Sequence, residues 1–232
     1  MTHQLHKQFR RRYFVVSTGT EGYDLRHMIK ALLLIFDPTP TWERIAVAQR
    51  KCVLILAGHL LPLLLLAGLA EGYGLVRWGK PRGNIAHTQT MPLSQAIVFE
   101  TAQLILSLLL VFLGARLIKS LGETFHGRHS FLQTFTVAAY GLSPLFLLRL
   151  LNAFPALSPW VTWGIGIVLS AAVLYNGLPR VMQPDPPHTF GLYLMSVVLL
   201  LMITGLACFL TTWYLQGKFP RLDAIVSHFI PS

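Results

Sequence analysis

Charged residues are scarce in this sequence. Asp, Glu, Lys and Arg together make up 12% of the 232 residues, whereas a soluble domain carries about 25%. A chain with so little charge lacks the polar surface that a soluble fold needs, so a soluble globular protein is excluded. Among the charged residues, acidic ones are the less frequent, with nine Asp and Glu against nineteen Lys and Arg. Because the basic residues flank apolar segments, their partners are expected to be anionic lipid headgroups, and nucleic acid is not expected.

Cysteine is also rare, and only Cys52 and Cys208 are present. Two cysteines in or beside apolar segments provide neither a disulfide framework nor the spacing of a metal site. His126 and His129 stand three residues apart, but no third ligand follows nearby. The sequence contains neither His-Glu-x-x-His nor Gly-x-Ser-x-Gly. We therefore expect no metal, no cofactor and no enzymatic activity.

Apolar residues, in contrast, make up 53% of the chain, and the mean hydropathy is +0.56. They gather in five segments, most of them near the 20 residues or so that cross a hydrocarbon core of about 30 Å. The predicted fold is therefore all-α, a polytopic five-helix transmembrane bundle over residues 51–216. The predicted spans are 52–70, 93–115, 127–151, a short fourth span at 160–175, and 190–215.

The third of these spans is interrupted in an unusual way. Tyr140, Gly141, Ser143 and Pro144 stand in its middle, and Arg149 lies near its end. Proline removes a backbone donor, and a kink is tolerated in a membrane only where neighbouring helices or a hydroxyl group satisfy the freed carbonyl. This segment is therefore predicted to be a buried, central helix that does not face lipid.

The N-terminal region is polar and then amphipathic. Residues 1–22 are predicted to be a basic cytoplasmic tail, and 23–50 to form amphipathic helices in the membrane interface. Thr39 is the expected N-cap of the second of these helices, with Pro40 at its first position. Trp42 is expected at headgroup depth, half exposed to water. Residues 217–232 are predicted to be a short non-cytoplasmic tail.

The distribution of basic residues predicts the orientation. Thirteen Lys and Arg lie beside the spans on the side of the N-terminus, and five lie on the other side. Because basic residues are retained on the cytoplasmic side, the N-terminus is expected in the cytoplasm and the C-terminus outside.

Four polar side chains are predicted within the membrane: His59, Glu100, Gln103 and Arg149. Glu100 and Arg149 would lie at similar depth on consecutive spans, and we predict an ion pair between them. The alternative is that each reaches the headgroups separately. For His59 the alternatives are a neutral packing residue with a hydrogen bond, and a residue that binds a proton or a ligand.

Three motifs together resemble the Ypt/Rab-interacting-protein (YIP) family of membrane proteins. They are Pro38-x-x-x-Trp42-x-x-Ile45, Ala139-Tyr140-Gly141-Leu142-Ser143-Pro144 and Tyr175-x-Gly177-Leu178-Pro179. The family's Gly-Tyr-x-x-x-Pro pattern is present with alanine in place of its first glycine. The Asp-Leu-x-Gly-Pro motif of eukaryotic trafficking members is missing. This argues against direct binding of a small GTPase and favours a prokaryotic-type member in a bacterial inner membrane.

The resemblance implies a non-enzymatic membrane organiser or partner-recruiting scaffold, whose partner is a second copy of the chain or another membrane protein. The alternative is a small transporter or lipid-handling protein that uses the intramembrane polar residues. Convergence of these residues on a cavity would favour the alternative. An intramembrane hydrolase would require Ser143, His59 and Glu100 to lie close together.

Overall fold

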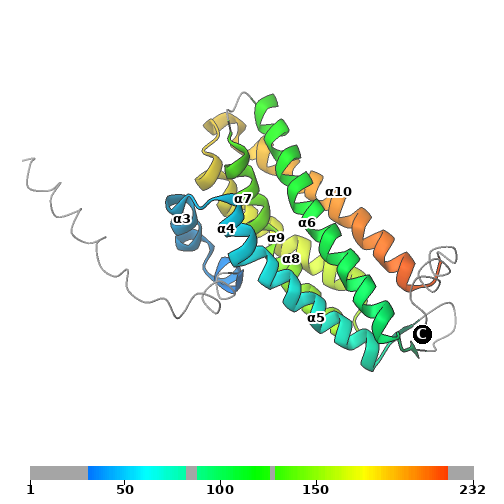
Figure 1. The fold of residues 1–232 in the computed structure, drawn as a ribbon. Helices are drawn as coiled ribbons and strands as arrows, with labels where there is room; N and C mark the ends of the chain where they lie inside the picture. Colours follow the sequence, from blue (N-terminus) through cyan, green and yellow to red (C-terminus); the bar gives the residue numbers. More distant parts are fainter. Residues whose placement is uncertain (1–30, 82–87, 126–128, 219–232) are drawn as a thin grey trace, which may run out of the picture.

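A computed structural model describes residues 31–81, 88–125 and 129–218 of the chain. This part contains five helices long and apolar enough to cross a membrane, packed as one bundle (Figure 1). An all-α, five-span architecture is thereby confirmed. The spans are Cys52–Arg77, Leu93–Thr124, Phe131–Ala153, Pro159–Met182 and Pro186–Leu215. A two-residue antiparallel pairing of β1 (Lys80–Pro81) with β2 (Thr88–Gln89) lies between the first two spans.

The first span has three parts. α4 (Cys52–Ile55) leads into a wider π-helical turn, Leu56–Leu60, and α5 (Leu61–Arg77) completes the span. The wide turn lies directly before Pro62, whose missing N–H interrupts the regular ladder of helical hydrogen bonds. His59 is therefore carried on irregular backbone.

The third span is the central one, as predicted. It consists of α7 (Phe131–Gly141), α8 (Ser143–Leu148) and a 3₁₀ turn, Arg149–Ala153. Of its apolar window, 67% is buried, compared with 22–44% for the other spans. The break at Leu142 precedes Pro144, and the Ser143 hydroxyl donates to the Ala139 carbonyl at 3.1 Å. A side-chain hydroxyl thus satisfies a backbone carbonyl at the break.

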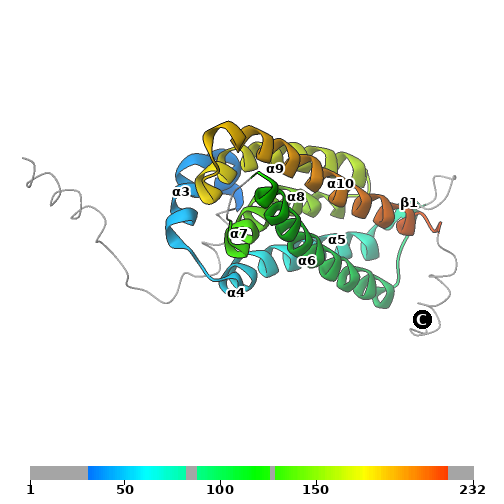
Figure 2. The ribbon, with the colours of Figure 1, turned by 90° about the horizontal axis from the view of Figure 1, so that it is seen from above.

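The first span, α6 (Leu93–Thr124) and α9 (Pro159–Met182) pack against this central span. α6 and α10 (Thr189–Leu215) pack together, and α9 contacts α7, α8 and α10. Figures 1 and 2 show α3 (Pro38–Ala48) at one end of the bundle, with the end of α10 at the other. We call the second end, where α5 and α10 end and α6 and α9 begin, the loop end. It is the end predicted to face outside.

Three predicted spans were too short: the first, the fourth, and the second, which was predicted to end at residue 115 and continues to Thr124. α5 continues to Arg77, beyond the predicted end of the first span at residue 70, so Glu71 belongs to a helix. Glu71 is buried there by its pairing with Arg149. α9 continues through Pro179 to Met182. The Arg180 guanidinium donates to the Asn176 carbonyl at 2.6 Å and so supports the turn that the proline disturbs.

The amphipathic region is helical where it is described, but two details were wrong. Residues 31–36 are helical, whereas 1–30 lie outside the described residues, as do 219–232. α3 begins at Pro38 with Asp37 in the N-cap position, so Thr39 is not the cap. Proline at the first helical position loses no hydrogen bond there. Trp42 is not half exposed but fully buried, at 0%.

Candidate functional site

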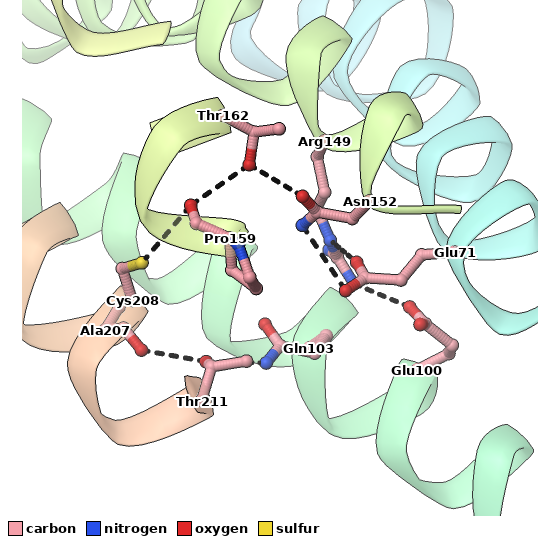
Figure 3. A network of polar contacts seen from close by, with 10 residues as sticks. All are labelled: Glu71, Glu100, Gln103, Arg149, Asn152, Pro159, Thr162, Ala207, Cys208 and Thr211. Atoms are coloured by element: carbon pink, nitrogen blue, oxygen red, sulfur yellow. Dashed lines mark hydrogen bonds and ion pairs between the residues drawn. The ribbon is translucent and has the colours of Figure 1, made fainter. Parts of the chain in front are cut away.

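Polar side chains in the membrane gather in two places. One group, the loop-end cluster, contains Glu71, Glu100, Arg149 and Asn152 (Figure 3). From the ends of α5 and α6, the two carboxylates lie about 9–10 Å into the bundle. The other group, the α3-end cluster, contains Trp42, His59, Tyr140 and Ser143. The four predicted intramembrane polar residues are therefore divided, with Glu100, Gln103 and Arg149 near the loop end and His59 elsewhere.

Arg149 is the centre of the loop-end cluster. Its Nη2 lies 2.6 Å from Glu100 Oε2, and its Nε lies 2.7 Å from Glu71 Oε2. The side chains are 12%, 14% and 2% exposed for Arg149, Glu100 and Glu71. The predicted ion pair between Glu100 and Arg149 is present, and the separate-headgroup alternative does not describe the structure. Glu71 is a second partner that the sequence analysis missed.

Two glycines of α5 make room for this arrangement. A Cβ on Gly68 would lie 3.1 Å from Glu100 Oε2, and one on Gly72 would lie 3.2 Å from Glu100 Cγ. Such approaches are closer than nearly all real Cβ contacts. The four-residue spacing places both glycines on one helix face. The absence of side chains there lets Glu100 lie across α5 and reach the guanidinium of Arg149.

Hydrogen bonds extend the cluster to the remaining spans. Asn152 donates from Nδ2 to Glu71 Oε1 at 3.4 Å, and its Oδ1 accepts the Thr162 hydroxyl at 2.6 Å. Gln103 donates from Nε2 to the Thr211 hydroxyl at 2.7 Å, which joins α6 to α10. Gln103, Asn152 and Thr162 thus each have a hydrogen-bond partner, as a low-dielectric interior requires.

A cavity of about 100 Å³ lies beside these residues. All five spans contribute to its walls, which are apolar over most of their area and carry several hydroxyl, amide and charged groups. A polar cavity of this size has room for several water molecules. The polar residues that line it are Glu71, Gln103, Ser107, Arg149, Asn152, Thr162, Thr204, Cys208, Thr211 and Thr212.

The α3-end cluster is built on Trp42. Its indole Nε1 donates to the Val173 carbonyl of α9 at 3.0 Å, and its ring meets Tyr140 edge-on with centroids 6.3 Å apart. A Cβ on Gly177 would lie 2.3 Å from the indole, so only glycine leaves space for the ring. Ile45 packs against the same core from α3. One residue from each of the three sequence motifs therefore meets in a single packed contact.

His59 joins this cluster from the first span. Its ring lies over Tyr140 with centroids 4.3 Å apart, and Nε2 lies 2.8 Å from the Ser143 hydroxyl oxygen. The Ser143 hydroxyl thus lies within hydrogen-bond distance of both the imidazole and the Ala139 carbonyl. Gly141 is in close contact with α9, since a Cβ there would lie 2.3 Å from Leu174 Cδ2.

Ser143 and His59 lie within hydrogen-bond distance, but Glu100, the third group of the hydrolase arrangement, does not join them. The two side chains are 0% and 2% exposed, and Glu100 belongs to the other cluster. The contact instead ties the first span to the third. Within the described ranges, no group of three or more His, Cys, Asp and Glu is placed to hold a metal ion; His126 lies outside those ranges.

The remaining motif residues have separate places. Tyr175 is 59% exposed and meets Tyr193 edge-on at 5.3 Å, away from Trp42. Pro144 is buried in the first turn of α8, and Pro179 lies within α9. Pro38 is the first residue of α3. These prolines shape the backbone that carries the cluster.

Glu71 and Asn152 are the two cluster residues that sequence reasoning missed. Glu71 is followed by two glycines within three residues, a pattern typical of loops. The sequence did indicate that the helix continues past Glu71, because Leu75 and Val76 extend the apolar stripe of α5. Gly74 is required by packing and does not mark a loop, since a Cβ there would collide with the Ala153 backbone at 2.2 Å.

One histidine outside the spans is also buried. His129, two residues before the third span, is 8% exposed, and its Nε2 has no hydrogen-bond partner among the described residues. Burial lowers the pKa of the His129 imidazole below the ordinary value of 6.5, and a hydrogen bond with the Met182 backbone opposes this in part. The imidazole is therefore accommodated in its neutral form.

Comparison with known proteins agrees with the motifs. The family model described as Yip1 domain matches residues 32–209, which include α3, the first four spans and most of the fifth. No curated protein and no solved structure matches the chain significantly. Since the match covers well over half of the 232 residues and all the motifs that meet at Trp42, the chain belongs to the YIP family of integral membrane proteins.

Proposed function

We propose that the protein is a non-enzymatic membrane organiser that recruits a protein partner through the exposed face of α3. The supporting observation is that α3 is held firmly against the transmembrane bundle. Trp42 is completely buried and hydrogen-bonded to α9, so α3 is anchored to the transmembrane core. Its opposite face is exposed, with Glu43 and Arg44 beside Val47, which is 85% exposed.

An anchored helix suits this task because its surface is held in place before binding. A partner that meets a preformed surface does not have to order it, so less conformational entropy is lost on association. The face carries one acidic, one basic and one apolar side chain within two turns. A small interface of this composition is typical of a transient protein–protein contact and differs from an active site.

Site-specific photocrosslinking in native membranes tests the proposal. A photoreactive amino acid replaces Val47 on α3 or, as the control, Leu206 on α10, which is 60% exposed. We expect a discrete protein adduct at position 47, either with a second copy or with one other membrane protein, and lipid adducts at position 206. The adduct at 47 should disappear when Trp42→Ala releases α3. Lipid adducts alone at both positions would contradict recruitment by this face.

A second candidate is a small transporter or lipid-handling protein. The loop-end cluster favours it, because polar side chains from all five spans meet around one cavity, as binding sites between membrane helices do. Cys208 lines that cavity and provides a natural probe. In a Cys52→Ala background, a small membrane-impermeant thiosulfonate should modify Cys208 from the loop-end side. Modification only after unfolding would indicate a closed bundle and exclude this candidate.

A further inference from the structure

A second, larger cavity lies between α5 and α6. It is a groove of about 480 Å³ with almost entirely apolar walls and no residue from the other spans in its lining. Leu65, Leu69 and Tyr73 of α5 line one side, and Leu93 and Ile97 of α6 line the other. All five side chains are 51–73% exposed. The groove therefore opens toward the space that lipid occupies.

The groove has the length of one leaflet. On α5 it extends from Val76 to Leu64, and on α6 from Leu93 to Leu104, which corresponds to about 17–18 Å at 1.5 Å per residue. Half of a hydrocarbon core of about 30 Å is about 15 Å. The groove begins at the loop end and stops near the middle of the membrane.

The width of the groove distinguishes between two kinds of occupant. Spread over that length, 480 Å³ gives a mean cross-section of about 27 Å². A helix with its side chains is about 10–12 Å across and occupies about 80–110 Å². The enclosed part of the groove is thus too narrow to take in a whole helix, and a slender acyl chain is the occupant that it can enclose.

A cationic side chain, Arg77, directly follows Val76, the last residue of α5 that lines the groove. Arg77 follows Leu65, Leu69 and Tyr73 at four-residue intervals, so it continues the face of α5 that lines the groove. Arg77 is exposed, and within the described part of the chain it forms no ion pair. Next to it, Trp78 stacks on Phe154 with centroids 6.2 Å apart. Aromatic side chains of this kind mark headgroup depth.

We propose that the α5–α6 groove binds one phospholipid of the leaflet at the loop end. One acyl chain lies in the groove, and the phosphate accepts charge-assisted hydrogen bonds from Arg77, a geometry to which the guanidinium is well suited. The site goes beyond both functions proposed above, because a bound lipid can serve a scaffold as well as a lipid-handling protein.

Photocrosslinking from the lipid tests the acyl-chain part of the site. The full chain is reconstituted in phosphatidylcholine vesicles with a trace of phosphatidylglycerol that carries a diazirine on one acyl chain, and adducts are mapped by peptide mass spectrometry. We expect adducts concentrated on α5 and α6. Ile97→Trp fills the groove and should reduce them about tenfold, the effect of a lost contact of modest strength. Leu109→Trp is the matched control, because Leu109 is 59% exposed on the same helix but does not line the groove.

A second arm tests the headgroup part. Arg77→Gln should lower the ratio of phosphatidylglycerol adducts to adducts of a diacylglycerol probe, which has no phosphate, about tenfold, because a charge-assisted hydrogen bond to the phosphate is lost. The ratio is the measure because the phosphatidylcholine of the vesicle competes equally with both probes. Both variants change exposed positions, and unaltered thermal unfolding would show that they fold. Equal adducts in Ile97→Trp and Leu109→Trp, or crosslinks between two copies of the chain at the groove, would overturn the proposal.

Discussion

Removal of the Arg149 guanidinium should be the most damaging single change in the membrane-embedded part of the protein. In Arg149→Gln, Glu71 and Glu100 both lose the charge that lies 2.7 and 2.6 Å away. Loss of one partner of a buried ion pair costs about 3–5 kcal/mol, since the remaining charge is left in a low-dielectric site. For a chain of this size, that corresponds to a decrease in unfolding temperature of about 6–20 °C.

The three neutral variants should form a ranked series. Glu71→Gln is expected to cost less than Arg149→Gln, because Arg149 retains Glu100. Glu100→Gln should cost least, because Arg149 retains Glu71, the more deeply buried carboxylate. The assay is thermal unfolding of purified protein in one detergent, together with a double-mutant cycle between Glu71 and Arg149. Coupling in that cycle should exceed about 1 kcal/mol.

Charge reversal provides a check with a different expectation. In Glu100→Arg with Arg149→Glu, the pair between positions 100 and 149 is restored, but a carboxylate now faces Glu71. We therefore expect expression to recover only partly from the level of either single variant. An Arg149→Gln protein that unfolds at the wild-type temperature would refute the reasoning, as would a cycle without coupling.

Three further predictions concern the rest of the bundle. Gly177→Ala should release α3 from the bundle, since a Cβ would lie 2.3 Å from the Trp42 ring. Increased proteolysis of α3 would report the release. In the control Gly164→Ala, where a Cβ has nothing within 4 Å, α3 should stay protected from proteolysis. Ser143→Ala should lower stability by about 1–3 kcal/mol in thermal unfolding, because two buried groups lose their hydrogen-bond partner. In the folded protein the pKa of His129 lies below the unfolded value of 6.5. The contribution of neutral His129 to stability should therefore be fully present above pH 6.5 and should be lost as the pH falls below it. In His129→Phe this loss of stability at low pH should be weaker.

For each of these three predictions, one result would contradict the reasoning. Equal protection of α3 in the two glycine variants would show that the indole does not depend on position 177. An unchanged Ser143→Ala protein would mean that the contact between the first and third spans contributes little. An identical pH profile in His129→Phe would assign the acid sensitivity to another group.

The sequence predicted the five spans and their central member because both follow from local patterns. Apolar length defines a span, and Ser143 and Pro144 identify the span that has to be buried. The Glu100–Arg149 pair was also within reach, since depth along two consecutive helices is a matter of counting residues. The family resemblance rested on motifs that the structure brings to Trp42.

Two of the errors share a physical cause, because they depend on contacts between distant segments. Glu71 lies in a helix since Arg149, 78 residues away, pairs with it; local glycines alone suggest a loop. Trp42 is buried since Gly177 leaves a gap in α9, and nothing near Trp42 in the sequence reveals that gap. Helix α9 continues past Pro179 with support from Arg180, against the local tendency of proline to end a helix.

The number of membrane crossings is the claim on which all other arguments depend. Paired fusions of a cytoplasm-only fluorescent reporter and an externally active phosphatase, placed before Met1 or after Ser232 in otherwise intact chains, measure it directly. An odd number of crossings predicts opposite sides for the two ends, with fluorescence only at the N-terminus and phosphatase activity only at the C-terminus. Both ends on one side would contradict the five-span bundle.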